Sequence, residues 1–459
     1  MNAQRRTSSD RRRRTNLADR CTALNFPETP IERFATSERA AQICAVMIFL
    51  LPAMALTTRV SVGLVEAVLL LSGLAFMAPL WQQRAHLFAP ARLVILAFAF
   101  NLIVAAISLQ STGFEWRFME NPIKMLLALL AIGMILLMRP RAQVLWLGLC
   151  VGTIGAAGFA IFQRFFLLMP RAEGFSMPIT FGDLAMAMGL MSLAGLQHSS
   201  APASASRRSS PQYILYLSLA AGVTASILSG SRGGWLALLL SFLPMYSYGR
   251  HALGRRTVVI LVASVGLMGA ASLLPQTGVR ERVMDVQREI TLYNNGNPDT
   301  SVGARLEMWK GAWTLFLEHP VTGIGRANYN RGLNELIDRG VINPAMRTYH
   351  HAHNELLNAL ATQGLLGALA LIALYAAPLR FFTRQLKLEG PHRPYALAGV
   401  LLVLSFVDFG LTQVMFAHHV SSAFYAVTVC VLVGLCLEQR RLATGLQASS
   451  LVDTNKPLS

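Results

Sequence analysis

The chain contains 459 residues, of which 54% are hydrophobic and only 14% are charged, and its mean hydropathy is +0.46. Soluble globular proteins carry roughly 25% charged residues, so the composition argues against a soluble enzyme, and the high hydrophobic content argues against disorder outside the two ends. A polytopic membrane protein remains, with a formal net charge of +17 from 40 Lys and Arg against 23 Asp and Glu. An excess of basic residues of this size is typical of proteins that contact nucleic acid, anionic lipid or an anionic substrate.

Twelve apolar segments have the length of roughly 17–25 residues that a membrane-spanning helix requires. They cover about 40–56, 60–79, 93–109, 123–138, 144–162, 179–196, 213–228, 233–248, 258–274, 356–379, 395–411 and 420–437. The sequence therefore predicts an all-α polytopic membrane protein in five parts. These are a disordered Arg-rich tail at 1–39, nine helices at 40–274, a large loop at 275–355, three helices at 356–437 and a second tail at 438–459.

The basic residues alternate between the connections that join these segments. The two tails and the even-numbered connections hold 25 positive residues, whereas the short odd-numbered connections hold six. Because cytoplasmic loops carry the excess of Lys and Arg, both tails are predicted to be cytoplasmic and the large loop periplasmic. The Arg-rich first tail then reads as a topogenic segment beside anionic lipid, and not as a nucleic-acid arm.

The large loop is predicted to contain two short helices. Within 303–316, Leu306, Trp309, Trp313 and Phe316 recur at helical spacing, which suits an interfacial helix lying against the membrane or other loops. The Gly323-Ile324-Gly325 stretch reads as a turn, and a second helix is expected at 328–339.

Two predicted outward-facing stretches carry an arginine beside a helix start. In Ser229-Gly230-Ser231-Arg232-Gly233-Gly234-Trp235, the glycines permit close backbone approach and the following helix offers N–H groups to an anion. Arg232 would add a guanidinium suited to phosphate; the alternative is a tight turn with a snorkelling arginine. Arg305 lies at the start of the first loop helix, where its position taken alone favours a plain surface arginine.

A third stretch, Tyr349-His350-His351-Ala352-His353-Asn354-Glu355-Leu356, enters the tenth segment. Imidazole titrates near neutral pH and serves as a general base, although a polar helix cap would also explain the composition. A metal site with His418 and His419 lacks a convincing third and fourth ligand, so we expect no metal and no cofactor. The roles of His350, His418, His419 and Asp408 stay open, and the Arg171–Pro178 stretch is a fourth, weaker candidate.

Together, these clusters place arginines and histidines on one face of the membrane. Arginines stabilise a phosphate-bearing leaving group and a histidine deprotonates an attacking hydroxyl, so the residues indicate a transfer reaction on a lipid-linked phosphate or diphosphate. Because ATP is absent outside the cytoplasm, the energy for the reaction would reside in the substrate.

The twelve segments, the SGSRGGW and HAHNELL motifs and the Arg-bearing loop helix resemble the O-antigen ligase/polymerase superfamily over roughly 40–437. The resemblance implies a GT-C-like, metal-independent, inverting glycosyltransferase in the bacterial inner membrane. It would move O-antigen from undecaprenyl diphosphate onto lipid A–core oligosaccharide at a periplasmic site, among membrane lipids and without nucleic acid.

The same resemblance assigns roles to residues. His353 is implied as the general base and His351 as accessory, with Asn354 completing the His-Asn pair. Arg232 and Arg305 would bind the diphosphate, supported by Gly233 and Gly234. Arg171 and Trp309 are further substrate-binding candidates, and packing competes with sugar stacking as the role of Trp309.

Three alternative functions follow from the same observations. An O-antigen polymerase would use the same donor with a glycan acceptor, and a protein O-oligosaccharyltransferase would use Ser or Thr of a protein. A lipid or glycan transporter would also be polytopic, but it should show internal repeats and helices broken at the membrane midplane.

Overall fold

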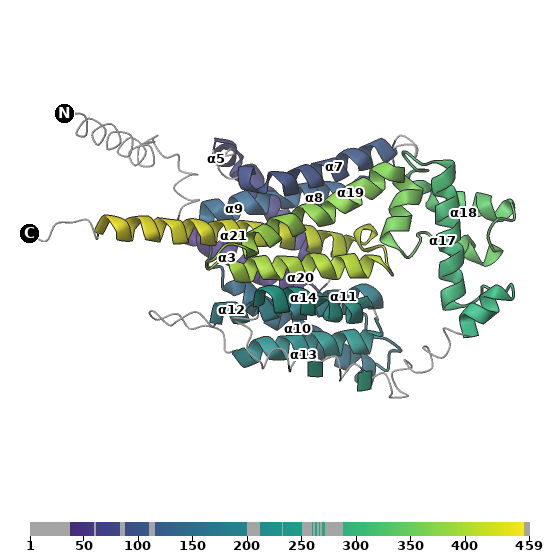
Figure 1. Cartoon of the computed structure of the whole chain (residues 1–459), viewed down its shortest axis with the longest axis horizontal. Helices are drawn as coiled ribbons and strands as arrows, with labels where there is room; N and C mark the ends of the chain where they lie inside the picture. Colours follow the sequence, from purple (N-terminus) through teal and green to yellow (C-terminus); the bar gives the residue numbers. More distant parts are fainter. Residues whose placement is uncertain are drawn as a thin grey trace, which may run out of the picture.

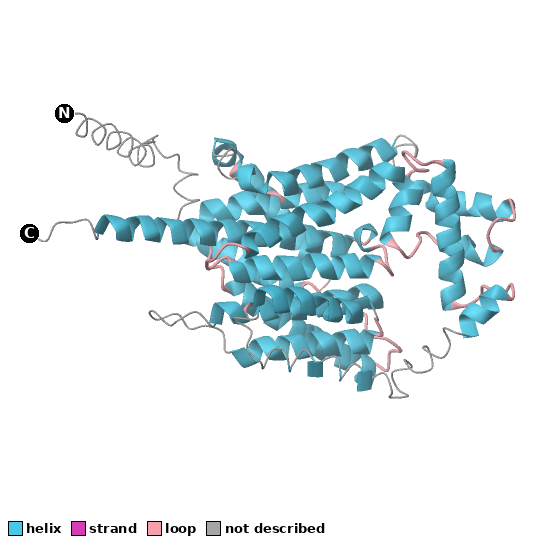
Figure 2. Cartoon of the chain, in the orientation of Figure 1, coloured by secondary structure: helices cyan, strands magenta, loops and turns pink. Residues whose placement is uncertain are grey.

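The computed structural model describes residues 37–58, 61–82, 88–109, 115–199, 212–231, 233–249 and 288–453, together with isolated positions between 259 and 270. Every regular element within these residues is helical, as Figure 2 shows. The predicted all-α polytopic fold is therefore confirmed, and the predicted ninth segment at 258–274 lies largely outside the described residues.

Within the described part, seven helices are long and apolar enough to cross a membrane. They span Ala89–Leu109, Trp116–Met138, Val144–Phe166, Gln212–Ser229, Glu355–Leu386, Arg393–Gly410 and His419–Thr444. Two shorter apolar helices at Gly63–Ala75 and Pro178–Ala194 accompany them. The predicted count of twelve stays a prediction.

The first half of the chain forms a series of hydrophobic helices with several breaks. In chain order these are α3 (Glu38–Met54), α4 (Ser61–Ala75), α5 (Met77–Gln82), η1 (Ala89–Ala91), α7 (Arg92–Leu109), η3 (Trp116–Met119), α8 (Glu120–Ala128), α9 (Leu130–Met138), α10 (Val144–Ile161), the π-helical turn η4 (Phe162–Phe166), α11 (Pro178–Ala194), α12 (Leu196–Ser199), α13 (Gln212–Ser229) and α14 (Gly233–Gly249). The second and fourth predicted spans are each divided into two α-helices.

Glycines allow some of these helices to approach closely. A Cβ atom on Gly152 of α10 would lie 2.1 Å from the backbone oxygen of Pro52 in α3. A Cβ atom on Gly222 of α13 would lie 2.5 Å from the backbone oxygen of Ala185 in α11. Small residues at such crossings are typical of helix packing in membranes, where van der Waals contact replaces the hydrophobic effect.

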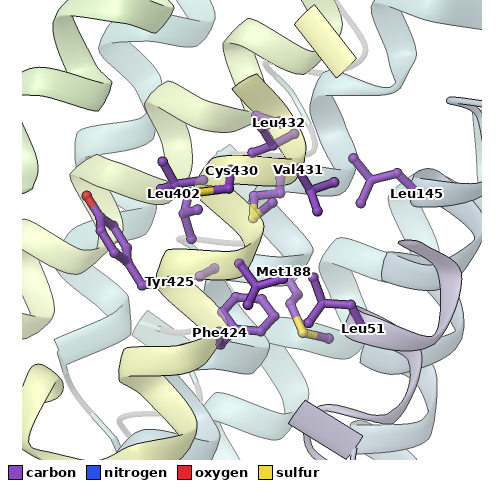
Figure 3. Close-up of a cluster of buried hydrophobic side chains, with 14 of the residues drawn as sticks. Leu51, Leu145, Met188, Leu402, Phe424, Tyr425, Cys430, Val431 and Leu432 are labelled. Carbon is purple, nitrogen blue, oxygen red and sulfur yellow. The ribbon is translucent and has the colours of Figure 1, made fainter. Parts of the chain in front are cut away.

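The centre of the bundle is formed by α20 (Arg393–Gly410) and α21 (His419–Asp453). Almost all of α20 and residues 421–438 of α21 are buried, as expected for helices surrounded by protein. Figure 3 shows Leu402 of α20 and Phe424, Tyr425, Cys430, Val431 and Leu432 of α21 beside Leu51, Leu145 and Met188 of α3, α10 and α11. This packing joins the last helices of the chain to α3, α10 and α11.

At one end of the bundle, a small helical subdomain carries the residues of the large loop. Figure 1 shows its main helix, α17 (Ser301–Glu318), running crosswise to the bundle, with α18 (Tyr329–Asp338) beside it. The short helices η6 (Arg326–Asn328) and η7 (Pro344–Thr348) belong to the same subdomain. The Thr300 side chain caps α17 by accepting a hydrogen bond from the Gly303 N–H at 3.0 Å.

The two predicted loop helices are present, but the buried face of the first differs from its most apolar stripe. Met308, Ala312 and Leu315 of α17 pack with Leu333 and Leu336 of α18. Leu306, Trp309 and Phe316 are half-buried and Trp313 is 46% exposed, so this aromatic stripe faces away from α18. Small residues of α17 face α18 because the absence of a side chain at Gly311 lets α18 approach closely. A Cβ atom on Gly311 would lie 2.7 Å from the Leu333 side chain.

A break in α19 (Glu355–Leu386) joins this subdomain to the bundle. Gly364 has φ +62° and ψ −153°, which interrupts the helix. The segment 320–325 packs into the break: the N–H groups of Ile324 and Gly325 donate to the carbonyls of Ala361 and Thr362 at 3.1 and 2.8 Å. In return, the Leu365 and Leu366 N–H groups donate to Pro320 and Val321 at 2.8 and 3.3 Å. Backbone groups that the break would leave unpaired are therefore satisfied.

We predict that Gly364→Ala lowers the thermal unfolding midpoint of the purified protein. The new Cβ would lie 2.4 Å from the Val321 backbone, and the positive φ is strained for any residue with a side chain, so a loss of about 2 kcal/mol is expected. Gly158→Ala in α10 is the matched control, because no atom lies within 4 Å of its Cβ position. Equal midpoints for the two variants would contradict this account of the break.

Candidate active site

The histidine-bearing segment links η7 to the start of α19 at the end of the bundle that faces α17. Asn354 caps α19: its Oδ1 accepts a hydrogen bond from the Leu357 N–H at 3.0 Å, and its Nδ2 donates to the Leu411 carbonyl at 3.1 Å. Both ends of the Asn354 amide are thus engaged within the protein, which makes this residue a positioning group for the histidines beside it.

His353 lies in a left-handed backbone conformation with φ +48°, which is uncommon for a residue with a side chain. Its ring centroid lies 4.2 Å from that of His351 and 6.1 Å from that of Tyr349. The His351 ring lies 5.9 Å from that of His418, just before α21. Strained conformations of this kind cluster at functional sites, where the surroundings hold them in place.

The His353 ring has a hydrogen-bonding partner on one side only. The buried Gln413 side chain hydrogen-bonds to it, while Nδ1 is buried and has no hydrogen-bond partner among the described residues. Gln413 is itself oriented by the Val414 N–H, which donates to its Oε1 at 3.1 Å.

Arg305 lies near the start of α17, close enough to act electrostatically on His353. Burial, the Arg305 charge and His418 lower the pKa of His353 to about 4, although the Gln413 hydrogen bond acts in the opposite direction. Burial and the neighbouring histidines lower the pKa of His351 to about 3. Both rings are therefore neutral near pH 7, with lone pairs available. Burial also lowers the pKa of Arg305, but its guanidinium stays charged.

The glycine-rich loop before α14 is fixed by hydrogen bonds to a buried acidic side chain. Asp183 of α11 is fully buried, and its Oδ1 accepts hydrogen bonds from the Ser231 hydroxyl and, at 3.1 Å, from the Gly234 N–H. Arg232 lies outside the described residues, but its neighbours on both sides are thus fixed by one carboxylate. The sequence suggested that the Gly234 N–H serves an anionic ligand, whereas Asp183 occupies it here.

Arg171 hydrogen-bonds to the backbone of the same loop. Its Nε donates to the Ser229 carbonyl at 2.7 Å, and the Ala172 N–H donates to the Leu228 carbonyl at 3.1 Å. At Gly230, with φ +66°, a Cβ would lie 3.4 Å from the Arg171 Nε, so the loop and the guanidinium are in close contact. These contacts give Arg171 a positioning role for the loop.

Three consecutive residues after α20 connect this loop to the histidines. The Leu411 carbonyl accepts from Asn354, Thr412 lies against Gly233, where a Cβ would be 3.2 Å from its Oγ1, and Gln413 hydrogen-bonds to His353. The residue next to Arg232 and the His353 ring are therefore attached to one short backbone segment. The structure brings His351, His353, Asn354, Arg305, Gly233 and Gly234 to one region of the molecule.

A cavity of about 490 Å³ opens beside the histidines, between α7, α8 and α19. Its lining includes His350, His351 and His418 together with Arg326 and Glu355. Neither Arg305 nor His353 belongs to this lining. His351 therefore lies between two environments, the Arg305–His353 pair on one side and the cavity on the other.

Several contributors to this region were missed by sequence reasoning. Asp183 and Glu355 could have been singled out from the sequence, since ionisable residues in or beside apolar helices are often functional. Nothing in the sequence marks Gln413 or Arg326, because only the folded chain brings them to the histidines. Trp309 is half-buried on the outer face of α17, and its indole N–H is buried without a partner among the described residues.

The remaining histidines do not gather around one point. The His419 Nδ1 atom lies 3.2 Å from the Lys124 ammonium, whose positive charge disfavours a metal ion at this ring. The His418 ring instead lies beside that of His351. No three His, Cys, Asp or Glu side chains within the described residues are arranged to hold a metal ion. Asp408, in α20, is buried near Asp183.

Comparison with known proteins relates this chain to one family. Residues 217–372, which contain the glycine-rich loop, α17 and the histidines, match the family described as O-Antigen ligase. The chain is 22% identical over 371 residues to an uncharacterized protein of Haemophilus influenzae, covering 79% of this chain and 90% of that protein. It is 23% identical over 180 residues to the O-antigen ligase of Escherichia coli, covering 39% of this chain and 40% of that protein. The resemblance to the O-antigen ligase/polymerase superfamily is thereby confirmed.

We predict that Asp183→Ala lowers the thermal unfolding midpoint more than Ser231→Ala does. The first change leaves the Ser231 hydroxyl and the Gly234 N–H without their buried acceptor, which costs about 1–3 kcal/mol for each such group. The second change removes one donor and leaves the Gly234 bond in place. A midpoint for Asp183→Ala at or above that of Ser231→Ala would show that the carboxylate does not hold the loop.

Proposed function

We propose that this protein is an O-antigen ligase of the bacterial inner membrane. It transfers O-antigen glycan from undecaprenyl diphosphate to lipid A–core oligosaccharide on the periplasmic face, and both termini are cytoplasmic. The observation that carries the proposal is the attachment of the glycine-rich loop and the His353 ring to the single segment 411–413. The family match and the apolar bundle support it.

In the proposed reaction, His353 is the general base. The Gln413 hydrogen bond engages one side of the ring and leaves the Nδ1 lone pair to accept the proton of an acceptor hydroxyl. The hydroxyl oxygen then attacks the anomeric carbon of the donor sugar. The bond from that carbon to the diphosphate oxygen breaks, its electron pair leaves with undecaprenyl diphosphate, and the anomeric configuration inverts.

Arg305 and Arg232 are proposed to stabilise the departing diphosphate. Guanidinium groups pair with phosphate through two parallel hydrogen bonds and keep their charge. The positive charge of Arg305 also keeps His353 neutral before the reaction. The energy of transfer comes from the donor's own diphosphate bond, and the side chains present supply acid–base and electrostatic catalysis without a cofactor.

We predict that His353→Ala, Arg305→Ala and Arg232→Ala fail to restore ligated lipopolysaccharide in a strain that lacks the gene. Loss of a general base typically lowers a rate by about 10²–10⁴-fold, so lipid-linked O-antigen should accumulate and the high-molecular-weight ladder should disappear on a lipopolysaccharide gel. Membrane abundance of each variant is measured in parallel.

His319→Ala and Arg331→Ala are matched controls, because both residues are exposed on the same subdomain. Each should restore a normal ladder. A normal ladder from His353→Ala would refute the base assignment. A gene-deletion strain whose core carries a single repeat unit would instead identify an O-antigen polymerase.

A further inference from the structure

Arg326 enters the cavity beside the histidines at a fixed position. It follows the segment that fills the α19 break, so its backbone is fixed by the Gly325-to-Thr362 hydrogen bond of 2.8 Å just before it. Its own N–H donates to the Ser108 Oγ of α7 at 3.0 Å. The side chain lines the cavity between α7 and α19.

The Arg326 guanidinium has no ion pair or hydrogen bond to any residue that the structure describes. The acid that lines the same cavity, Glu355, attracts it but does not contact it. Glu355 accepts instead from the Phe416 N–H at 3.1 Å and from the Met415 N–H. At the cavity mouth, Arg117 is already paired with Glu115 at 2.7 Å. Arg326 is therefore a half-buried cation whose donors are free to bind a ligand.

Two further polar groups of the lining are also unpartnered. The Gln363 side chain is 5% exposed, and its Nε2 is buried without an acceptor among the described residues. The His418 Nε2 is likewise buried without a partner in the described part of the chain. Buried donors that lack partners are rare in folded proteins, and a bound ligand is one reason for them. A cavity lined by a cation, a buried amide donor and an imidazole nitrogen suits an anion.

The cavity becomes apolar away from Arg326. Its lining continues along α19 to Leu371 and Leu374, and across α8 to Pro122 and Met125. A ligand that fills it thus has a charged group at the subdomain end and a hydrocarbon portion between the helices. The volume of about 490 Å³ lies within the usual range of roughly 300–1,000 Å³ for ligand sites.

We propose that this cavity is a second anion-binding site, in which Arg326, Gln363 and His418 bind a phosphoryl group carried on a lipid. It is separate from the Arg305–His353 pair, which does not line it. Two lipids offer this chemistry: a polyprenyl phosphate or diphosphate, and the headgroup of an anionic membrane phospholipid. If the bound lipid is the polyprenyl carrier of the glycan donor, that assignment rests on the proposed function. Binding of a phosphorylated lipid as such does not rest on it.

The test measures binding by the purified full-length protein in detergent, without transfer. The probes are undecaprenyl phosphate, undecaprenyl diphosphate and phosphatidylglycerol. The variants are Arg326→Gln, Arg326→Lys and the control Arg331→Gln, each made in an Arg232→Ala/Arg305→Ala background so that the proposed catalytic site does not bind the probe. Arg331 is the matched control because it is exposed and pairs with Glu335 at 3.6 Å. We expect Arg326→Gln to weaken binding of a polyprenyl probe by about tenfold or more and Arg326→Lys by less, since lysine keeps the charge but loses the planar fork.

Each outcome decides the proposal. Weaker binding of the polyprenyl probes alone assigns the site to the carrier lipid, and equal weakening of all three assigns it to phosphorylated lipids generally. Unchanged affinities in both Arg326 variants overturn the proposal; if Arg326→Gln does not fold, Arg326→Lys decides. A wild-type protein that binds polyprenyl phosphate through Arg326 but transfers no glycan would refute the proposed function and leave this site intact.

Discussion

The rest of this structure depends on the break in α19 and the segment that fills it. A helix interrupted at the membrane boundary leaves backbone groups unpaired, and in this environment each costs several kcal/mol. Residues 320–325 supply the missing partners around Gly364. These backbone hydrogen bonds anchor the helical subdomain, whose main helix α17 runs crosswise to the bundle in Figure 1. Arg326 is the first residue after this anchor, and the histidines are attached to the start of the same helix.

Buried polar groups then orient the loops at that end of the bundle. Asp183 holds the residues on both sides of Arg232, Arg171 holds the loop from the side, and Gln413 holds His353. These groups come from α11, from the segment before it and from the segment after α20. A site built this way is rigid, because moving any loop would leave a buried donor or acceptor unpaired. Rigidity is what charge stabilisation of a leaving group requires.

Hydropathy predicted most of the helices well, because the hydrocarbon thickness fixes how long an apolar run must be. Thus α7, α13 and α20 begin and end within two residues of the predicted segments. The buried face of α17 could not be predicted, since small residues at Ala312 and Gly311 matter more for close packing than the aromatic stripe. The α19 break could not be predicted either, because one glycine is compatible with a continuous helix. The helix is interrupted here because the segment 320–325 supplies hydrogen-bond partners for the backbone groups around Gly364. The motifs located His353 and Arg305, but Gln413, Asp183 and Arg326 reach the site only through tertiary contacts.

In the proposed reaction, a neutral histidine activates the acceptor without a metal ion. This step is tested most directly by the pH dependence of kcat/KM for glycan transfer by purified protein in EDTA, with lipid-linked donor and core acceptor. Because the pKa of His353 is lowered to about 4, its base form persists as the pH falls and is lost only near that value. We therefore expect kcat/KM to stay unchanged from about pH 7.5 to 5.5, whereas a base with the ordinary histidine pKa would give half the maximal value near pH 6.5. Loss of activity in EDTA, or a half-maximal kcat/KM near pH 6.5, would contradict this mechanism.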